Sequence, residues 1–462
     1  MREDNNRMLA LLSGKKLIFV GLGVSHSGIV RLLAAQGMDI TVCDKRGAEQ
    51  LGGLPGELSA LGVKLLLGSD YPAAFEGDVL LRTPGMYFYA PELTEFRARG
   101  GIVTSEMELF CRFCPCPILA VTGSDGKTTT TTLIAQLLKA QGHTVHLGGN
   151  IGRAMLGELE QISPTDLAVL ELSSFQLISM RCAPQVSVVT NMTPNHLDVH
   201  KDMPEYIDAK KNIYAHQDAF STTVLGADNA ITASFIPEVR GRCETFSLKT
   251  KVEDGAYLRA DGMLCRVQRG ADLPIVHKDE ICLPGEHNIA NLLAAICAVG
   301  DRVSPQTVAQ VARTFAGVEH RIELVRTLGG VKWYNDSIAT SPTRAMAGLA
   351  SFSQKIILIA GGYDKNLSYE PLAPALTEKV KLLILMGATA GKIEAALRVC
   401  PAFSEGNPVI LPAKDMADAV RLAHQHAREG DIVSLSPASA SFDSYPNFEV
   451  RGRHFKELVS AI

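Results

Sequence analysis

The stretch VTGSDGKTTTTTLIAQLL, residues 121–138, restricts what this chain can fold into more than any other part of it. It combines the end of an apolar strand, a glycine turn that carries a lysine, and the start of a helix. Backbone N–H groups at such a helix start favour phosphate oxygens, because the helix dipole is positive there. Only Ser124 and Asp125 separate Gly123 from Gly126, whereas the common P-loop has four residues between its glycines. The stretch therefore predicts a polyphosphate site with a shortened loop.

Lysine and threonine side chains would complete this site. Lys127 would place a positive charge at the β and γ phosphates, and Thr128 or Thr129 would offer a hydroxyl to Mg²⁺. The alternative without function is a glycine turn before a threonine-rich helix. Five consecutive threonines are poor helix formers, so this alternative explains the sequence less well.

Apolar strands and amphipathic helices alternate along the chain and predict an α/β protein. A chain of 462 residues is too long for one hydrophobic core. The stretch 251–270 departs from the alternation, since its Asp-Gly pairs at 254–255 and 261–262 are typical of hairpin turns. We predict three domains: a Rossmann-like N-terminal domain (1–113), a central domain with a P-loop-type ATPase sheet (114–317) and a Rossmann-like C-terminal domain (318–462).

Composition and charge argue against several classes of protein. A net charge of −4 and a pI near 6.3 are unlike a nucleic-acid binder, which usually has a basic excess. The polar N-terminus is unlike a signal peptide, and no apolar run approaches the ~20 residues of a membrane span. Ten scattered cysteines are typical of reduced thiols, so we expect a cytoplasmic protein. For CRFCPC (111–116) no second ligand pair for zinc stands out, which favours linker cysteines.

A second glycine turn follows the first predicted strand. Gly21 and Gly23 permit the close approach of a phosphate to the next helix, and Asp44 lies where an acid can bind a ribose or a base. The dinucleotide pattern is incomplete, because Gly28 comes too late and His26 stands at the position of the third glycine. The turn supports a nucleotide-shaped ligand, is weak evidence for NAD, and leaves open a Rossmann-like unit without a ligand.

Polar side chains at further strand ends extend the candidate site. Glu171 would hold a metal that bridges phosphates, and the alternative is a solvated acid at a strand end. His196, Asp198 and His200 offer either a histidine pair for a transition metal or one imidazole beside carboxylates for Mg²⁺ or Mn²⁺, and His200 is alternatively a surface-loop residue. Lys210 and its neighbour Lys211 indicate a solvated helix face.

Carboxamides and hydroxyls continue the pattern downstream. Asn288 and Asn291 share one helix face and would pair with an adenine edge, although helix capping also explains Asn288. The polar loop SPASASFDSYPNFEVRGRHF follows the last predicted strand. Polar groups spread over these strand ends suit a small, doubly charged substrate. Further candidates in the third α/β segment are Arg321, Asp336, Thr340 and Lys365.

These segments, in this order, resemble the Mur ligases of bacterial cell-wall synthesis and their relative folylpolyglutamate synthase. A short Gly-x-x-Gly-Lys-Thr loop is typical of that family and matches Gly123–Thr128. The resemblance covers nearly the whole chain. GVSH with VCDKR, NDSIATSPTRA and SPASASFDSYPNFEVRG are most similar to the member that adds D-glutamate to UDP-N-acetylmuramoyl-L-alanine. A Rossmann-like first domain argues against the two later-acting ligases, and FDSYPNFEVRG argues against the alanine-adding one.

The resemblance implies an ATP-dependent ligase of peptidoglycan precursor synthesis that works through an acyl-phosphate intermediate. ATP and Mg²⁺ at two sites, with Mn²⁺ as a substitute, would be its cofactors. UDP-N-acetylmuramoyl-L-alanine and D-glutamate would be its small-molecule substrates, and the protein would be a cytoplasmic monomer. The alternatives are a sister ligase with another amino acid, a non-catalytic nucleotide-binding regulator, and an NAD-dependent oxidoreductase, which leaves TGSDGKTT without a use.

Position by position, the resemblance also implies residue roles. The UDP substrate would contact Leu22, Val24, Ser25, Asp44, Lys45, Arg46, Gly85, Asn150, Ser173 and Gln176. ATP would contact Gly123, Ser124, Asp125, Gly126, Lys127, Thr128, Thr129, Asn288, Asn291, Arg321 and Asp336. Mg²⁺ would bind Thr128, Glu171, His196 and Lys210, the last as an N-carboxylated lysine, which reverses the solvated-face interpretation. D-Glutamate would contact Thr340, Lys365, Ser441 and the backbone of Phe448. The catalytic residues would be Lys127, His196 and Lys210.

Two positions depart from the family pattern. Ile338 stands where many relatives have lysine in an Asp-Ser-Lys-Ala-Thr run, so that lysine's substrate contact is missing or moved. GVSHSG differs from the commoner Gly-x-Ser-Gly turn, which changes the expected pyrophosphate contacts. Neither departure concerns the ATP chemistry.

Overall fold

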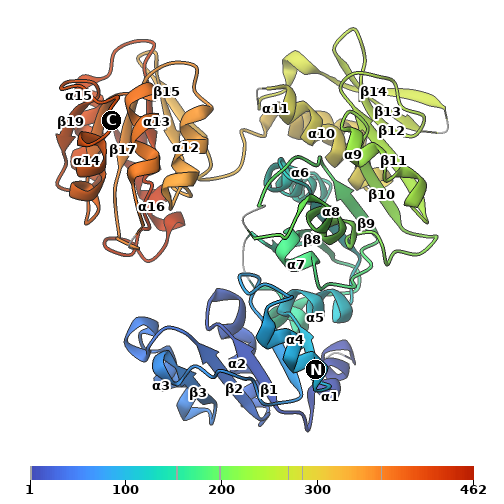
Figure 1. Cartoon of the computed structure of the whole chain (residues 1–462). Coiled ribbons are helices and arrows are strands. Elements are labelled where there is room, and N and C mark those ends of the chain that lie inside the picture. Colours follow the sequence, from blue (N-terminus) through green and yellow to red (C-terminus); the bar gives the residue numbers. More distant parts are fainter. Residues whose placement is uncertain (1–2, 152–153, 197–198, 269, 284, 366) are drawn as a thin grey trace. The chain divides into compact units, whose positions relative to one another are not determined.

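The computed structural model describes residues 3–151, 154–196, 199–268, 270–283, 285–365 and 367–462. The chain divides into two compact units, Met1–Phe315 and Ala316–Ile462. The first unit contains two β-sheets and the second contains one, and helices cover them (Figure 1). The predicted α/β class is confirmed, because parallel strands joined by helices form the centre of each sheet.

The N-terminal sheet has the strand order β3-β2-β1-β4-β5, and all its neighbouring pairs are parallel. The chain crosses from one side of β1 to the other before β4, and ligands bind Rossmann-like folds at such a switch point. The strands are β1 Leu17–Val20, β2 Ile40–Asp44, β3 Lys64–Leu67, β4 Val79–Arg82 and β5 Ile102–Thr104. The helices are α1 Glu3–Leu12, α2 Val24–Ala35, α3 Leu54–Ala60, α4 Pro91–Ala98 and α5 Glu106–Phe113.

The central sheet has the order β14-β13-β12-β11-β10-β9-β6-β8-β7. Its strands are parallel from β7 to β12, and β13 and β14 add an antiparallel edge. The strands are β6 Ile118–Thr122, β7 Val145–Gly149, β8 Leu167–Glu171, β9 Val186–Val189, β10 Thr222–Gly226, β11 Arg242–Ser247, β12 Gly255–Leu258, β13 Met263–Gln268 and β14 Ala271–His277. The helices are α6 Lys127–Ala140, α7 Ser174–Leu177, α8 Met203–Lys211, α9 Ala230–Ala233, α10 Glu286–Val299 and α11 Pro305–Thr314.

One of the two predicted hairpin turns is correct. The pair at 261–262 joins the antiparallel strands β12 and β13. The pair at 254–255 forms no hairpin, because Gly255 begins β12, which runs parallel to β11. A Cβ at Gly255 would collide with the backbone of Thr245, so this glycine permits the close approach of two strands.

The C-terminal unit has the sheet order β15-β16-β20-β17-β18-β19, and only β15 is antiparallel to its neighbour. The sequence predicts β16, β17, β18 and β20 but not the two edge strands, which are partly exposed. Strand β15 is interrupted by Arg326 and Thr327, and β19 has only four residues. The strands are β15 Glu323–Leu328, β16 Val331–Asn335, β17 Ile356–Ala360, β18 Val380–Leu385, β19 Val409–Pro412 and β20 Ile432–Leu435. The helices are α12 Pro342–Ala350, α13 Ala373–Lys379, α14 Ala390–Arg398, α15 Met416–His426 and α16 Phe448–Ala461.

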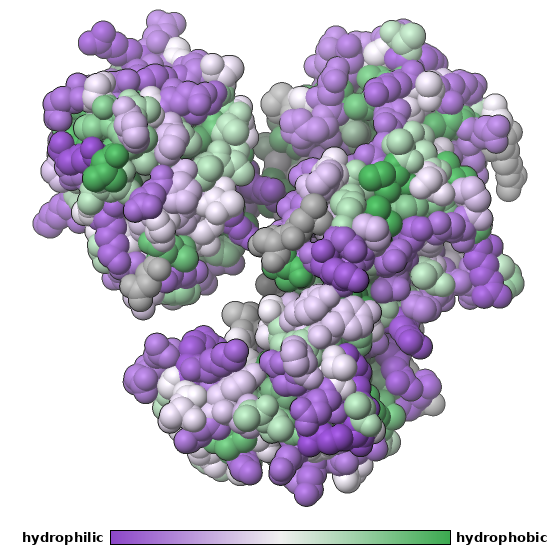
Figure 2. Space-filling view, viewed as in Figure 1, coloured by the Kyte–Doolittle hydropathy of each residue, from purple (hydrophilic) through white to green (hydrophobic). Residues whose placement is uncertain are grey.

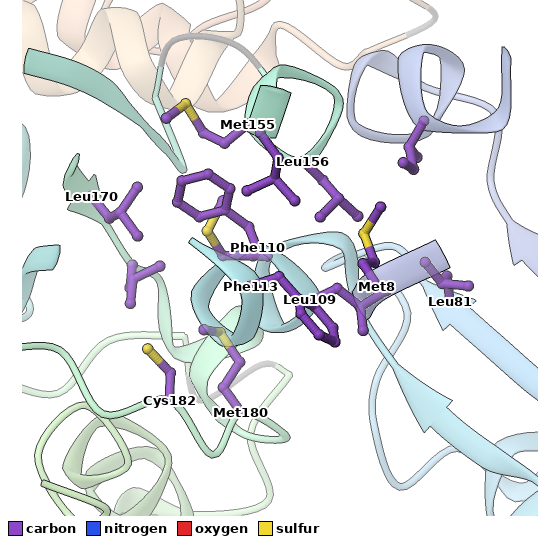
Figure 3. Packing of buried hydrophobic residues seen from close by; sticks show 14 of the residues in the cluster. Met8, Leu81, Leu109, Phe110, Phe113, Met155, Leu156, Leu170, Met180 and Cys182 are labelled. Carbon is purple, nitrogen blue, oxygen red and sulfur yellow. The ribbon is translucent and has the colours of Figure 1, made fainter. Parts of the chain in front are cut away.

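A single hydrophobic core joins the two sheets of the first unit (Figure 3). Helix α5 lies within it, and its Phe110 is fully buried. Met8 and Leu81 come from the N-terminal segment, whereas Leu170 and Met180 come from the central segment. The two sheets are therefore joined by a common hydrophobic core as well as by the chain itself.

The outer surface is mainly polar in the view of Figure 2, with apolar side chains scattered among hydrophilic ones. Within the part of the chain that the structure describes, no helix is both long and apolar enough to cross a bilayer.

Removing the Phe110 ring should destabilise the first unit. We expect Phe110→Ala to lower the free energy of unfolding by about 3–5 kcal/mol, because it leaves a cavity in a core that no neighbour can fill completely. Phe220 is 96% exposed, so Phe220→Ala should change the free energy of unfolding by less than about 0.5 kcal/mol. Urea denaturation followed by fluorescence measures both, and equal effects would contradict the assignment of this core.

Candidate active site

Residues 123–126 form the predicted short loop between β6 and α6. Gly123 has a φ of 144° and Gly126 a φ of 78°, both in the region that favours glycine. A Cβ on Gly123 would collide with the Thr190 hydroxyl, and one on Gly126 with the Asn291 amide oxygen. Both glycines are therefore required by backbone conformation and by lack of space.

The segment after β9 holds this loop through backbone and side-chain hydrogen bonds. The N–H groups of Ser124 and Asp125 donate to the main-chain and side-chain oxygens of Asn191 at 2.9 and 3.0 Å. The Thr190 hydroxyl donates to the Asp125 carbonyl at 2.6 Å. The N–H of Thr193 donates to the Ser124 hydroxyl at 2.9 Å. The loop conformation is thus set by contacts from a strand exit about 65 residues away in sequence.

Lys127 occupies the first turn of α6. Its ammonium donates to the carbonyls of Gly123 and Ser124 at 3.0 and 2.9 Å and therefore lies over the loop. A positive charge at the N-terminus of a helix, beside the loop N–H groups, provides the electrostatics that a polyphosphate needs.

Glu171 places a carboxylate at the same edge of the sheet. It ends β8 and pairs in register with Val121 of β6. Its side chain is 1% exposed; Oε1 accepts a hydrogen bond from Asn150 Nδ2 at 2.8 Å, and Oε2 has no hydrogen-bond partner among the described residues. A buried carboxylate oxygen without a donor is unfavourable unless a cation binds it. Mg²⁺ and Mn²⁺ prefer such oxygen ligands, so this residue fits a divalent cation.

The solvated-face interpretation of Lys210 is wrong. The residue is 2% exposed, and its Nζ donates to the Gly123 carbonyl at 2.8 Å and to Thr122 Oγ1 at 3.3 Å. Burial and then the charge of Lys127 lower the pKa of Lys210 well below its usual value, although Glu171 opposes them. An amine with a raised neutral fraction therefore lies directly beneath the phosphate loop.

The two histidines of TNMTPNHLDVH have different environments. His196 is exposed, has a φ of 55°, and lies edge-on to Phe175 at 5.1 Å. His200 is 2% exposed, and its ring stacks on the ring of Phe175 with the two centroids 5.3 Å apart. Its Nδ1 lies 3.1 Å from Glu205 Oε1 and its Nε2 2.9 Å from Ser174 Oγ. The surface-loop interpretation of His200 is therefore wrong, and its ring nitrogens are already engaged within the protein.

Side chains from the last residue of β4 and from the loop after it bond to this region. The fully buried guanidinium of Arg82 donates to the Phe175 carbonyl at 2.6 Å and to Ser179 Oγ at 2.8 Å. The Tyr87 hydroxyl donates to Glu205 Oε2 at 2.6 Å. The N-terminal sheet thus helps to hold the residues on which both histidines pack.

The turn after β1 is closed by Asp44. Its buried carboxylate accepts from the N–H of Leu22 at 2.7 Å and from the Arg46 guanidinium at 2.7 Å. Burial would raise the pKa of Asp44, but the hydrogen bonds from Arg46 and from the Leu22 N–H hold it below its ordinary value. Lys45 is exposed beside the Tyr71 ring. An ionised acid thus braces the predicted nucleotide turn, and a basic pair lies at its rim.

Other residues assigned to the UDP substrate lie in varied settings. Gly85 is in an exposed turn. Ser173 and Gln176 cap the short helix α7 reciprocally, with the Ser173 N–H 2.9 Å from Gln176 Oε1. The side chains of Val24 and Ser25, at the start of α2, and the whole of Asp198 lie outside the described residues.

Asn288 and Asn291 lie on α10, and Asn291 faces the phosphate-loop helix. Asn291 Oδ1 lies 3.3 Å from the Thr130 hydroxyl, and its Nδ2 donates to Asn288 Oδ1 at 3.3 Å. The capping interpretation of Asn288 is wrong, because the N-cap of α10 is Gly285.

In the C-terminal unit, Asp336 follows β16 and is 4% exposed. It accepts hydrogen bonds from Ser436 Oγ at 2.8 Å and from the Ile322 N–H at 3.3 Å. Burial raises the pKa of Asp336 to about 6. Arg321 and Lys365 are exposed, Thr340 is half-buried and Ser441 is buried.

Arg451 organises the loops that carry several of these residues. Its buried guanidinium donates to the Ser337 carbonyl at 2.8 Å and to the Ala440 carbonyl at 2.9 Å. The Ser337 hydroxyl donates in turn to the Phe448 carbonyl at 2.8 Å. Arg451, Arg82 and Tyr87 lie outside the set of residues predicted from the sequence. For Arg82 the available signal was an arginine that directly follows an apolar run, VLLR.

Among the described residues, one group of three histidine, cysteine or carboxylate side chains has its possible metal-ligand atoms within 4.8 Å of one another: Glu319, His320 and Glu323. Lys456 pairs with both glutamates at 3.1 and 2.6 Å, so a cation is already present there. In CRFCPC, the Sγ atoms of Cys114 and Cys116 are 3.6 Å apart.

The short glycine loop at a helix N-terminus and Lys127 define an α/β protein of the nucleotide-binding class. The Mur ligase middle domain matches residues 121–299, and the Mur ligase glutamate ligase domain matches residues 320–439. The chain belongs to the Mur ligase family.

Individual relatives match over the whole chain. The chain is 49% identical over 465 residues to UDP-N-acetylmuramoylalanine--D-glutamate ligase of Acetivibrio thermocellus, covering 100% of both chains. It is 46% identical over 464 residues to the enzyme of that name from Clostridium acetobutylicum, covering 100% of this chain and 99% of the relative. The solved UDP-N-acetylmuramate-alanine ligase of Thermotoga maritima has the same fold, with a TM-score of 0.53 at 18% identity over 97% of this chain and 99% of that one.

Replacing the loop glycine should weaken nucleotide binding. We expect Gly126→Ala to lower the affinity for a non-hydrolysable ATP analogue at least tenfold, because the added Cβ meets Asn291 in a left-handed backbone. Gly142, at the other end of α6, also has a positive φ but open space around it. Gly142→Ala should lose about 1 kcal/mol of stability and bind normally. Titration calorimetry compares them, and equal affinities would contradict this loop assignment.

Proposed function

We propose that this chain joins D-glutamate to UDP-N-acetylmuramoyl-L-alanine and converts ATP to ADP and phosphate, as a step of peptidoglycan precursor synthesis. The observation that carries this function is the 49% identity, over the full length of both chains, to a relative of that name. The phosphate loop and the polar strand ends around it give the function a physical basis.

The reaction has two balanced steps. A carboxylate is a poor acyl donor, so the γ-phosphoryl group of ATP first moves to the alanine carboxylate, which yields an acyl phosphate and ADP. The neutral amino group of D-glutamate then attacks the acyl carbon, the tetrahedral intermediate expels phosphate, and the nitrogen loses a proton to solvent, which leaves the amide. Catalysis of this kind depends on positioning and on charge stabilisation rather than on a side-chain nucleophile.

The loop residues would perform the positioning. The N–H groups of Ser124 and Asp125 are bonded to Asn191, so the N–H groups at the start of α6 and the Lys127 ammonium would bind the phosphate oxygens and hold the reactants in line. Asn288 and Asn291 would bind adenine from the neighbouring helix α10. His196 would be a catalytic residue at the exposed rim.

Two Mg²⁺ ions, with Mn²⁺ as a substitute, belong to this proposal. Thr128 and Glu171 would hold the first, which the unpartnered buried oxygen of Glu171 supports. His196 and Lys210 would hold the second. When bound, these ions would screen the charge of the phosphate oxygens. An ammonium group is no ligand for such an ion, so Lys210 fits this role only as a carbamate.

Carbamylation of Lys210 is directly measurable. The neutral amine favoured by burial adds to carbon dioxide and releases a proton, which turns a cation into a carboxylate. In ¹³C-bicarbonate we expect one protein carbamate signal in the ¹³C NMR spectrum. Lys210→Ala should abolish it, whereas Lys211→Ala should retain it, because Lys211 already pairs with Glu238 at 2.6 Å. A spectrum without the signal, or a signal that survives Lys210→Ala, would contradict the modification.

The remaining assignments rest on the family pattern. The UDP end would contact Leu22, Val24, Ser25, Asp44, Lys45, Arg46 and Gly85, and the acceptor's peptide end Asn150, Ser173 and Gln176. ATP would also contact Arg321 and Asp336. D-Glutamate would contact Thr340, Lys365, Ser441 and Phe448. We also propose division into domains 1–113, 114–317 and 318–462, a monomeric state and a cytoplasmic location, which the three sheets and the cysteine usage support.

Phosphate release is the direct test of the function. With ATP, Mg²⁺ and UDP-N-acetylmuramoyl-L-alanine, we expect release only when D-glutamate is added. L-Glutamate, L-alanine and no amino acid serve as parallel controls, and Lys127→Met should reduce the rate by at least a hundredfold. Release with another amino acid would indicate a sister ligase. Absence of release with every amino acid would favour a non-catalytic nucleotide-binding regulator. The replacement of the family's lysine by Ile338 would then be the first explanation to test.

A further inference from the structure

A cavity of about 430 Å³ lies in the first unit, away from the phosphate loop. It is lined by the first residues of three parallel strands, Val186 of β9, Thr222 of β10 and Arg242 of β11. The phosphate loop is held by residues that follow the last residue of β9. The cavity and the phosphate loop are therefore at opposite edges of the central sheet.

The other wall comes from the end of α10 and from β13. Ala298, near the end of α10, and Arg302, in the 3-10 turn that follows, line the cavity. Arg266 reaches it from β13 and donates to the Ile296 carbonyl at 2.8 Å. Three guanidinium groups and two carboxylates, those of Glu244 and Asp301, thus surround one concave space.

Two buried polar atoms of this wall have no hydrogen-bond partner among the described residues: Arg266 Nε and Glu244 Oε2. Arg266 is 7% exposed and Glu244 is 2% exposed. Their remaining atoms are paired, since an Arg266 terminal nitrogen lies 3.2 Å from Glu244 Oε1. A donor and an acceptor are therefore left unsatisfied in a low-dielectric wall, which is unfavourable without a ligand.

Arg302 adds an available positive charge. It is half-buried, and its guanidinium makes no hydrogen bond within the part of the chain that the structure describes. Arg242 is different, because it already forms a bidentate pair with Asp254 at 3.0 and 2.9 Å. The lining has a net charge of +1, three guanidiniums against two carboxylates. Unpaired guanidinium groups select carboxylate or phosphate oxygens.

We infer that this cavity binds a small organic oxyanion, a phosphate ester or a carboxylate, that also carries a hydroxyl or amino hydrogen. The anionic oxygens would accept from Arg302. Arg266 Nε and Glu244 Oε2 have almost no exposed surface, so a shift of the Arg266–Glu244 pair on binding would bring this donor and this acceptor to the ligand. The volume is in the range of small-molecule sites. The ligase activity assigns no role to this edge of the sheet.

Titration calorimetry of the full chain at constant ionic strength tests the inference. Glycerol 3-phosphate represents phosphate esters, citrate represents hydroxy-carboxylates, and inorganic phosphate and glycerol represent the anion or the hydroxyl alone. We expect glycerol 3-phosphate or citrate to bind at least tenfold more tightly than either partial probe. If neither reaches this tenfold difference over inorganic phosphate and over glycerol, the inference is overturned.

Variants locate the bound probe. Arg302→Gln should weaken binding at least tenfold, and Arg313→Gln, at an exposed arginine of α11, should leave it unchanged. Lys127→Met should also leave it unchanged, whereas loss in that variant would assign the probe to the phosphate loop and overturn the inference. The paired variant Arg266→Met with Glu244→Met removes both buried charges together and should abolish binding. If the paired variant does not fold, Arg302→Gln decides, and wild-type affinity in it overturns the inference.

Discussion

The active site depends on hydrogen bonds between the phosphate loop and the segment that follows β9. The loop has only two residues between its glycines, so its own backbone offers few internal contacts. The loop is held instead by hydrogen bonds to Asn191, Thr190 and Thr193, which follow β9. Because β6 and β9 pair in parallel, their carboxyl ends meet at one edge of the sheet, where these bonds can form. These bonds also position the carbonyls of Gly123 and Ser124, to which the Lys127 ammonium donates.

Two buried charged side chains connect the phosphate loop and α7 to other parts of the first unit. Lys210 lies beneath the loop, and Arg82 bonds the exit of β4 to α7. Charged groups are rarely buried unless each finds oxygen acceptors, as both do here. The shared apolar core around α5 places the two sheets so that Arg82 and Tyr87 reach their acceptors. Apolar packing and charge pairing therefore act together to hold Phe175, on which both histidines pack.

Much of the fold could be predicted from the sequence, because parallel buried strands are continuous apolar runs. Strands β6 and β17 have that pattern, and β18 has it after Lys381. The edge strand β15 is interrupted by Arg326 and Thr327, and the edge strand β19 has only four residues. The Asp-Gly pair at 254–255 has the sequence pattern of a hairpin turn, although Gly255 begins a strand that runs parallel to its neighbour. Only the neighbouring strand β11 shows that Gly255 permits close strand approach.

The sequence by itself determined the phosphate loop, the α/β class and the family, since these depend on glycine conformation, local periodicity and motif order. Tertiary structure decided the state of single side chains. Lys210 looks like a solvated lysine in the sequence, and His200 like a loop histidine, yet both are buried. Burial depends on partners that are distant in the chain, such as Gly123 for Lys210 and Ser174 for His200. The same holds for the charged cavity at the opposite sheet edge, because β9, β11, β13 and the end of α10 meet only in the folded chain.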